Sequence, residues 1–214
     1  MENYKQKFIS LSLEIGALKF GEFQLKSGRI SPYFFNMGLF SSGPLIKNIG
    51  DFYAAALVSS NINYDIVFGP AYKGIPIVTA LASSLSTSYQ LDKPFVYNRK
   101  EIKNHGEGGV TVGEELRGNV VIVDDVITAG TAIREAVEII NSSGATTTGI
   151  VISLDRQEKG TGDLSAAKEI SNALNIPVIS IVNLDEVIDY IENNPSDYGQ
   201  HIDKIKKYRE EYGV

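Results

Sequence analysis

The segment Val120 to Ala136, VVIVDDVITAGTAIREA, constrains the fold of this 214-residue chain more than any other part of it. It opens with four consecutive β-branched apolar residues, a pattern typical of a strand buried on both faces of a parallel sheet. Two adjacent carboxylates, Asp124 and Asp125, end that run, and a loop containing Gly130 leads into a helical repeat. The order of strand, acidic turn, glycine loop and helix predicts an α/β fold with a binding site at the end of the strand.

The residues of this loop favour a phosphorylated sugar as the ligand. N–H groups at the start of a helix bind anions, and Gly130 lets the backbone approach a phosphate closely. Carboxylates accept hydrogen bonds, so Asp124 and Asp125 suit sugar hydroxyls, or a hard cation such as Mg²⁺ that substrate oxygens also bind. The nucleotide fingerprints GxxxxGK[ST] and GxGxxG after a strand are absent. An ordinary acidic turn before a helix is the alternative interpretation.

Charge and composition exclude several classes of protein. The chain has 20 basic and 26 acidic residues, a net charge of −6 that disfavours nonspecific binding to nucleic acid. Without cysteine there is no disulfide framework and no thiolate ligand for a metal. No apolar run approaches the roughly 20 residues of a membrane span, and the start MENYKQKF lacks the layout of a secretory signal. We therefore expect a cytoplasmic protein without nucleic-acid or membrane partners.

The first 40 residues are expected to form a small cap, called the hood below. Apolar residues at helical spacing predict an amphipathic helix near the start, at Phe8, Leu11, Ile15 and Leu18. Residues 20–25 and 31–36 then predict two short strands joined in a hairpin around KSGR, which contains Lys26.

The second of these strands carries Phe34 and Phe35. Neighbouring strand residues face opposite sides of a sheet, so only one of the two rings joins the core easily. The other ring could face a flat heterocycle. The alternative is that both rings belong to the core and that Lys26 is a solvated turn residue.

Two further strand ends carry cationic side chains. The predicted strand 65–69 runs into PAYKG, whose Lys73 is a candidate anion ligand. The predicted strand 146–154 delivers Arg156, whose planar guanidinium suits a carboxylate or an imide. The alternatives are a surface charge at Lys73 and a structural ion pair between Arg156 and Asp155 or Glu158.

Residues 99–109, RKEIKNHGEGG, are basic, glycine-rich and nearly free of apolar anchors. This composition predicts an exposed mobile loop, placed at about 99–112. A lid that closes over an anionic substrate explains why cations gather here in an acidic chain, whereas a disordered connection is the alternative. The candidate lid residues are Arg99, Lys100, Lys103 and His105.

Together these segments resemble the type I phosphoribosyltransferase family, whose phosphoribosyl diphosphate signature matches the stretch after Val120. The paired phenylalanines, the lid with His105 and Arg156 after its strand resemble the orotate branch of that family. The resemblance extends over nearly the whole chain, through KFGEFQLKSGR, GPAYKGIP, RKEIKNHGEGG, ISLDRQE and YREEYGV. It implies a type I phosphoribosyltransferase fold over residues 1–214 as a single domain, with a central, mainly parallel sheet flanked by helices and the small N-terminal hood.

The resemblance also implies an activity, the transfer of the phosphoribosyl group from 5-phosphoribosyl 1-diphosphate to orotate in pyrimidine biosynthesis. The implied products are orotidine 5′-monophosphate and diphosphate. Mg²⁺ is the implied cofactor, bound mainly through substrate and water near Asp124 and Asp125. A homodimer is implied, because in this family the lid closes over the site of the partner subunit.

The resemblance assigns residues to each part of the reaction. The implied catalytic residues are Arg99, Lys103, His105, Asp124 and Asp125. The residues implied to bind phosphoribosyl diphosphate are Lys26, Tyr72, Lys73, Arg99, Lys100, Lys103, His105, Asp124, Asp125, Val126, Ile127, Thr128, Ala129, Gly130, Thr131 and Ala132. The residues implied to frame orotate are Lys26, Phe34, Phe35, Thr128 and Arg156.

Two other functions stay open at this point. One is a phosphoribosyltransferase that acts on another base, such as uracil or a purine. The other is a non-catalytic regulator that senses phosphoribosyl diphosphate and binds nucleic acid, against which the acidic charge balance and the cationic lid argue.

Overall fold

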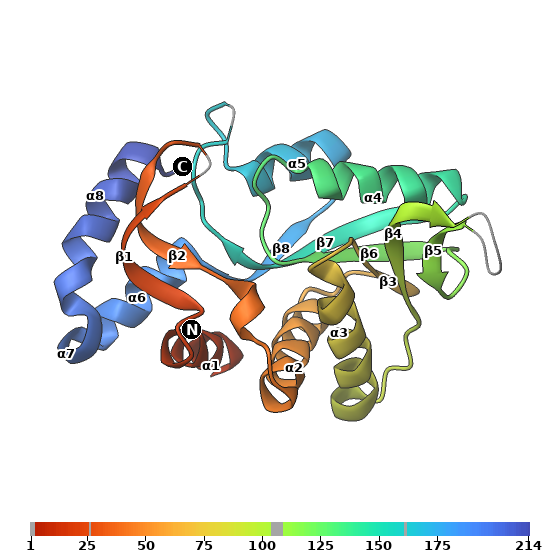
Figure 1. Cartoon of the computed structure of the whole chain (residues 1–214), viewed down its shortest axis with the longest axis horizontal. Helices are drawn as coiled ribbons and strands as arrows, with labels where there is room; N and C mark the ends of the chain where they lie inside the picture. The colour runs from red at the N-terminus through yellow and green to blue at the C-terminus, as the bar shows by residue number, and fades with distance from the viewer. Residues whose placement is uncertain (1–2, 26, 104–108, 161) are drawn as a thin grey trace.

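A computed structural model describes residues 3–25, 27–103, 109–160 and 162–214, with the backbone alone at 102 and 103 (Figure 1). Its centre is a six-stranded sheet in the order β5-β4-β3-β6-β7-β8. β5 runs antiparallel to β4, and the other neighbouring strands pair in parallel. A separate antiparallel sheet pairs β1 with β2. The predicted mainly parallel sheet and the small hairpin are confirmed.

The central strand of the sheet is the one that the sequence singles out. β6 (Asn119–Asp124) lies between β3 (Ile66–Gly69) and β7 (Thr146–Asp155), and its residues 120–123 are fully buried. A parallel strand covered by helices on both faces requires such a continuous apolar run. The sheet is completed by β8 (Val178–Asn183) on one edge and by β4 (Phe95–Lys103) with β5 (Gly109–Gly113) on the other.

Helices cover the two faces of the sheet (Figure 1). α2 (Gly43–Ser59) and α3 (Gly74–Tyr89) lie on one face, and α4 (Thr131–Ser142) and α5 (Ala166–Leu174) lie on the other. Because strand side chains alternate between faces, the molecule has two apolar cores. Val121 belongs to the core that contains α2, whereas its neighbour Ile122 belongs to the core that contains α4.

The strand order reverses between β3 and β6. The strand that follows β3 in the chain lies on one side of this pair, and the strands that follow β6 lie on the other. The loops after β3 and β6 therefore diverge and leave room between them at the carboxyl edge of the sheet. Such a topological switch point is where ligands bind in open α/β sheets.

The hood contains α1 (Asn3–Glu14) and the hairpin of β1 (Leu18–Gln24) and β2 (Ile30–Phe35). The predicted helical face through Leu18 is wrong, because Gly16 adopts a left-handed φ of 70° and Leu18 opens β1. In Figure 1 the hairpin lies beside α6 (Leu184–Asn193), α7 (Pro195–Tyr198) and α8 (Ile202–Tyr212). Short 3₁₀ turns, Met37–Leu39 and Gly199–His201, complete the described elements.

Residues 99–103 form the end of β4 rather than the predicted loop. β4 and β5 pair as an antiparallel ribbon in which Asn98 lies opposite Thr111 and Lys103 lies opposite Gly109. Backbone pairing stabilises this ribbon, so it needs no apolar anchors in its own sequence. His105 lies outside the described residues. No helix in the described ranges has the length and apolar character needed to span a membrane.

Candidate active site

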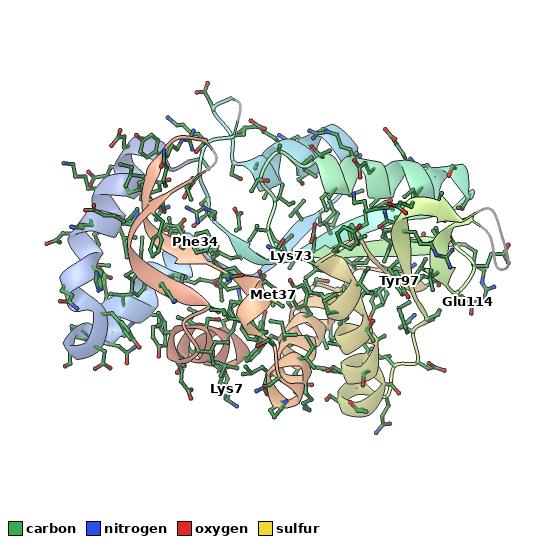
Figure 2. The ribbon with its side chains drawn as sticks, viewed as in Figure 1. Lys7, Phe34, Met37, Lys73, Tyr97 and Glu114 are labelled. Atoms are coloured by element: carbon green, nitrogen blue, oxygen red, sulfur yellow. The ribbon has the colours of Figure 1, made fainter. Side chains whose placement is uncertain are left out.

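Two buried carboxylates lie at the switch point of the sheet. Asp124 is the last residue of β6 and is 9% exposed, and Asp125 follows it at 7%. The Asp125 N–H donates to the Asp124 carboxylate over 2.9 Å. The loop after β3 brings Lys73 to the same place, where its ammonium forms an ion pair with the Asp125 carboxylate (Figure 2). The acidic turn and the candidate anion ligand Lys73 therefore lie together at the switch point.

The acidic pair has an unusual protonation equilibrium. Burial, followed by repulsion from Asp125, raises the pKa of Asp124 to about 7, against the opposing effect of Lys73 and Lys100. Two carboxylates this close cannot both ionise easily without cations. A cation or a hydroxyl donor beside these two carboxylates therefore stabilises their ionised forms.

The loop between the acidic turn and α4 has the form of an anion-binding cradle. Gly130, the residue before α4, adopts φ 72° and has no side chain with which to cap the helix. A Cβ atom at Gly130 would lie 2.6 Å from Cδ1 of Ile170, so a larger residue requires that side chain to move and also meets the strain of the left-handed φ. Arg134 donates to the carbonyl of Ala129 over 2.7 Å and braces the loop. The exposed side chains of Thr128 and Thr131 flank the start of the helix.

The loop after β3 is held by a residue that the sequence did not single out. Ala71 N–H donates to Oδ1 of Asn98, a buried residue of β4, over 2.8 Å. This bond fixes the loop from which Tyr72, 72% exposed, projects next to Lys73. Asn98 carried little signal in the sequence, because it begins the polar part of β4, where charged residues follow it.

Arg156, which the resemblance assigns to the orotate site, connects the body to the hairpin. Its guanidinium donates to Glu158 over 2.6 Å and to the Ser31 hydroxyl over 3.0 Å, and it stacks 4.2 Å from the centre of the Tyr33 ring. The Tyr33 hydroxyl in turn donates to Glu158 over 2.9 Å. Burial lowers the pKa of Arg156, but Tyr33 and Glu158 more than compensate and raise it, so the cation is kept.

The ion pair between Arg156 and Glu158 was the alternative interpretation of Arg156, and the structure contains it. Tyr33 and Ser31 were missed by the sequence reasoning. Both are buried in β2, where strand periodicity alone marks them as core residues.

The two phenylalanines of β2 separate as predicted. Phe35 packs against Phe8 in the core, with ring centres 5.9 Å apart. Phe34 is 40% exposed and stacks on Phe23 at 5.5 Å, on the hairpin labelled in Figure 2. One ring is therefore available to a ligand.

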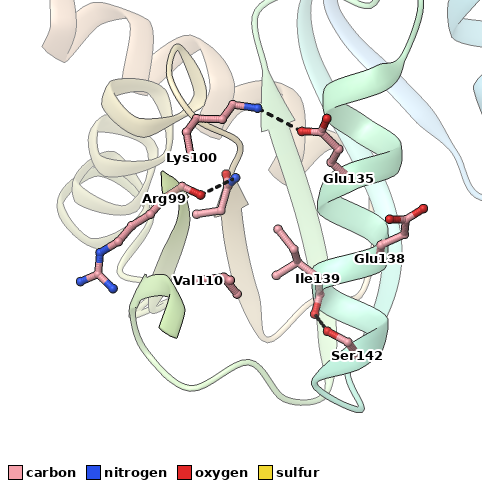
Figure 3. Close-up of a pocket in the computed structure, with 8 residues that line it drawn as sticks. Arg99, Lys100, Val110, Glu135, Glu138, Ile139 and Ser142 are labelled. Carbon is pink, nitrogen blue, oxygen red and sulfur yellow. Dashed lines mark hydrogen bonds and ion pairs between the residues drawn. The ribbon is translucent and has the colours of Figure 1, made fainter. Parts of the chain in front are cut away.

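The ribbon of β4 and β5 borders a pocket of about 470 Å³ beside α4 (Figure 3). Lys100 points toward α4 and pairs with Glu135 at 3.0 Å. Arg99 extends to the opposite side and donates to the carbonyls of Gly109 and Thr111, both at 3.2 Å. Arg99 therefore does not face the acidic turn of its own chain.

The structure thus brings the acidic turn, the glycine loop and Lys73 together and joins Arg156 to the hairpin. Lys26 and His105 lie outside the described residues, and the Lys103 side chain is not described. Among the described residues no group of three or more histidine, aspartate or glutamate side chains could hold a metal ion. Asp124 and Asp125 nevertheless offer hard oxygen donors of the kind that Mg²⁺ prefers.

Comparisons with known proteins give consistent results. The family described as phosphoribosyl transferase domain matches residues 40–184. The chain is 55% identical to an orotate phosphoribosyltransferase of Shigella flexneri and 52% identical to one of Mannheimia succiniciproducens, over the full length of each protein. A crystal structure of the orotate phosphoribosyltransferase of Francisella tularensis is 45% identical, with a TM-score of 0.88 over 97% of this chain and 100% of that one.

Proposed function

The chain belongs to the orotate phosphoribosyltransferase family, and we propose that it transfers the phosphoribosyl group of 5-phosphoribosyl 1-diphosphate to orotate. The products are orotidine 5′-monophosphate and diphosphate. The observation that carries this proposal is the meeting of the acidic turn, Lys73 and the glycine loop at the switch point of the sheet. The relatives' names support orotate as the acceptor.

In this proposal the acidic turn and the glycine loop bind the ribose phosphate. Asp124 and Asp125 accept hydrogen bonds from the ribose hydroxyls, because a carboxylate is an acceptor with two oxygens. Residues 128–131 hold the 5′-phosphate, since the loop ends at an uncapped helix start with a glycine that allows close approach. Tyr72 and Lys73 lie on the opposite loop and contact the diphosphate.

We assign the base side of the site to Arg156, Phe34, Phe35, Thr128 and Lys26. Orotate carries a carboxylate, and the buried guanidinium of Arg156 is a charged donor that remains protonated. The half-exposed ring of Phe34 offers a face for the pyrimidine. This assignment distinguishes orotate from uracil, which lacks the carboxylate.

The chemistry follows from these charges. The N1 nitrogen of deprotonated orotate forms a bond to C1′ of the ribose while the bond from C1′ to the diphosphate oxygen breaks, and the electron pair leaves with diphosphate. Positive charge develops on the ribose ring and negative charge on the leaving group. Lys73 stabilises the leaving group, together with Arg99, Lys100 and Lys103 of the ribbon and with His105, and such preorganised charge is usually the largest contribution to catalysis.

Mg²⁺ belongs to this proposal as the cofactor. Asp124 and Asp125 are the residues that fit it, because hard cations prefer carboxylate oxygens and retain several water ligands. When bound, the ion neutralises part of the diphosphate charge.

We further propose a homodimer in which the ribbon of one chain completes the site of the other. The outward direction of Arg99, opposite to that of Lys100, supports this arrangement, because a side chain on that side reaches a different acidic turn more readily than its own (Figure 3). The proposal treats residues 1–214 as one domain with the hood at 1–40, working in the cytoplasm as suits nucleotide biosynthesis.

One assay tests the activity. Orotate is incubated with phosphoribosyl diphosphate and the enzyme, with Mg²⁺ added or chelated, and the loss of orotate absorbance is followed. We expect rapid loss that depends on Mg²⁺, and no reaction when uracil, adenine or hypoxanthine replaces orotate. Turnover of another base in preference to orotate contradicts the assignment of the base, and no turnover of any base supports a regulator instead.

A further inference from the structure

The backbone of the acidic turn is held by two buried hydroxyls that belong to other elements. Tyr53 of α2, fully buried, donates its hydroxyl to the carbonyl of Asp124 over 2.7 Å. Ser153 of β7, also fully buried, donates its hydroxyl to the carbonyl of Asp125. Two consecutive peptide groups are thus fixed, one by a helix beneath the sheet and one by the neighbouring strand.

The pairing of the strands explains why Asp124 needs such a donor. The ladder between β3 and β6 ends at the pair Phe68 and Ile122. Beyond this pair, the N–H of Ala71 donates to Oδ1 of Asn98 instead of to β6. The Tyr53 hydroxyl supplies the missing donor, at the point where the chain turns toward Lys73.

On the other side, the ladder continues and is reinforced. The Ser153 N–H donates to the Asp125 carbonyl over 2.9 Å, and the Ser153 hydroxyl shares the same acceptor. Ser153 is a polar residue within a strand segment, 150–154, that is otherwise apolar and buried. A buried hydroxyl in such a place requires a partner, and this one finds it in the acidic turn.

We propose that Tyr53 and Ser153 are positioning residues of the transfer reaction, whose hydroxyls fix the Asp124 and Asp125 peptides so that both carboxylates keep the direction needed for the ribose. This inference rests on the proposed function, in which the acidic turn binds the ribose hydroxyls. The site needs fixed carboxylates because displacements of about 1 Å in positioning groups cost large factors in rate. The two residues touch no substrate and act through the turn.

The test compares hydroxyl deletions inside and outside this contact. Tyr53→Phe and Ser153→Ala remove the two hydroxyls, and Asp125→Asn tests the turn directly. Tyr64→Phe and Ser12→Ala are matched controls, because the hydroxyls of Tyr64 and Ser12 are buried and have no hydrogen-bond partner among the described residues. The Michaelis constants for phosphoribosyl diphosphate and for orotate are measured separately, and phosphoribosyl diphosphate binding with Mg²⁺ is measured by calorimetry.

We expect Tyr53→Phe and Ser153→Ala each to raise the Michaelis and dissociation constants for phosphoribosyl diphosphate by about three- to tenfold, the effect of one hydrogen bond. The Michaelis constant for orotate should change by less than about twofold. In the controls Tyr64→Phe and Ser12→Ala, the Michaelis constants for both substrates should also change by less than about twofold. A purely structural role would lower the melting temperature and leave this selectivity absent. Should Ser153→Ala fail to fold, Tyr53→Phe decides the matter, because it keeps the ring and its packing.

Two results overturn the inference in distinguishable ways. In the first, Asp125→Asn raises the Michaelis constant for phosphoribosyl diphosphate but Tyr53→Phe and Ser153→Ala behave like their controls. The positioning role is then wrong and the proposed function stands. If Asp125→Asn also leaves that constant unchanged, the ribose role of the turn is wrong, and the positioning role is wrong with it.

Discussion

The proposed ribose-phosphate side and the proposed base side of the site are held in place by different kinds of interaction. On the ribose-phosphate side, loops at the ends of parallel strands are fixed through backbone groups, as at Ala71, Asp124 and Asp125. On the base side, Arg156 is fixed by side chains alone, and its partners Ser31 and Tyr33 lie on a hairpin far away in the sequence.

This difference indicates where a substitution can change the choice of base while leaving the sheet intact. Backbone carbonyls are present whatever the side chain, so the ribose-phosphate side depends mainly on the fold. The base side depends on a few side chains, and the contact between Tyr33 and Glu158 joins residues 125 positions apart. A substitution there alters the choice of base without disturbing the sheet. The following predictions test whether the two sides are separable.

The largest expected effect belongs to neither side but to the ribbon. Lys103→Ala should lower the turnover number by well over tenfold, because a charge-assisted bond made mainly in the closed state is worth about 1.5 to 3 kcal/mol. Steady-state kinetics measures this effect, and Lys7→Ala, an exposed lysine of α1 labelled in Figure 2, is the control. Turnover that stays the same in Lys103→Ala removes the ribbon from the mechanism.

Arg156→Ala should raise the Michaelis constant for orotate by about tenfold or more and leave that for phosphoribosyl diphosphate nearly unchanged. The variant loses the charged donor and leaves Glu158 with its longer ion pair, 4.0 Å from Arg29. Arg117→Ala, which removes an exposed arginine paired with Glu114, is the control. An equal rise in both constants would mean that the two sides are coupled.

Tyr33→Phe tests the base side more finely. The hydroxyl that it removes donates to Glu158, and Glu158 in turn holds Arg156, the proposed ligand of orotate. The Michaelis constant for orotate should rise by about two- to fivefold, since Glu158 loses one hydrogen bond and Arg156 becomes less well fixed. Stacking of the ring on Arg156 is kept. Tyr64→Phe again serves as the control, and a change confined to phosphoribosyl diphosphate would contradict the separation of the sides.

The smallest effect is on stability and concerns the ribose-phosphate side. The pKa of Asp124 is raised to about 7 in the folded protein from 3.8, so the folded state holds this proton more tightly than the unfolded state. Stability is therefore lost as the pH rises from about 4 to 7. Asp124→Asn should remove that loss and raise the melting temperature at pH 8 by about 2 to 4 °C per kcal/mol regained.

Calorimetry without substrate or Mg²⁺ measures this gain. The gain should shrink at pH 5, where Asp124 is largely protonated in the folded protein. A gain of the same size at both pH values would show that repulsion within the acidic turn does not limit stability. Activity should fall in the same variant, because the site uses the charge that destabilises the fold.

The sequence allowed the centre of the fold to be predicted, because an apolar run between residues 120 and 123 followed by two carboxylates has few structural solutions. It also predicted that Phe34 and Phe35 face opposite ways, since strand geometry requires it. The ribbon was missed at residues 99–103, because strands that pair with each other at a sheet edge need no apolar residues of their own.

The supporting residues of the site could not be predicted in the same way. Tyr53 falls on the apolar face of α2 and Tyr33 on the buried face of β2, so the periodicity that assigns them to the core hides their hydroxyl contacts. Such contacts depend on the distances between elements, which packing sets. Ser153 was detectable in principle as a polar residue inside an apolar strand segment, whereas Asn98 begins the polar part of β4 and has no such signal.

The contact between Gly130 and Ile170 has a consequence for how the protein can evolve. Ile170 fills the space that a side chain at position 130 would need, and it comes from α5, which supplies no other part of the site. A Cβ atom at position 130 therefore requires the Ile170 side chain to move, so substitutions at the two positions are coupled. A smaller residue at 170 makes room at 130, where residues that tolerate a left-handed backbone, such as asparagine, meet the least strain. The sequence of the glycine loop thus depends on a neighbour outside the site.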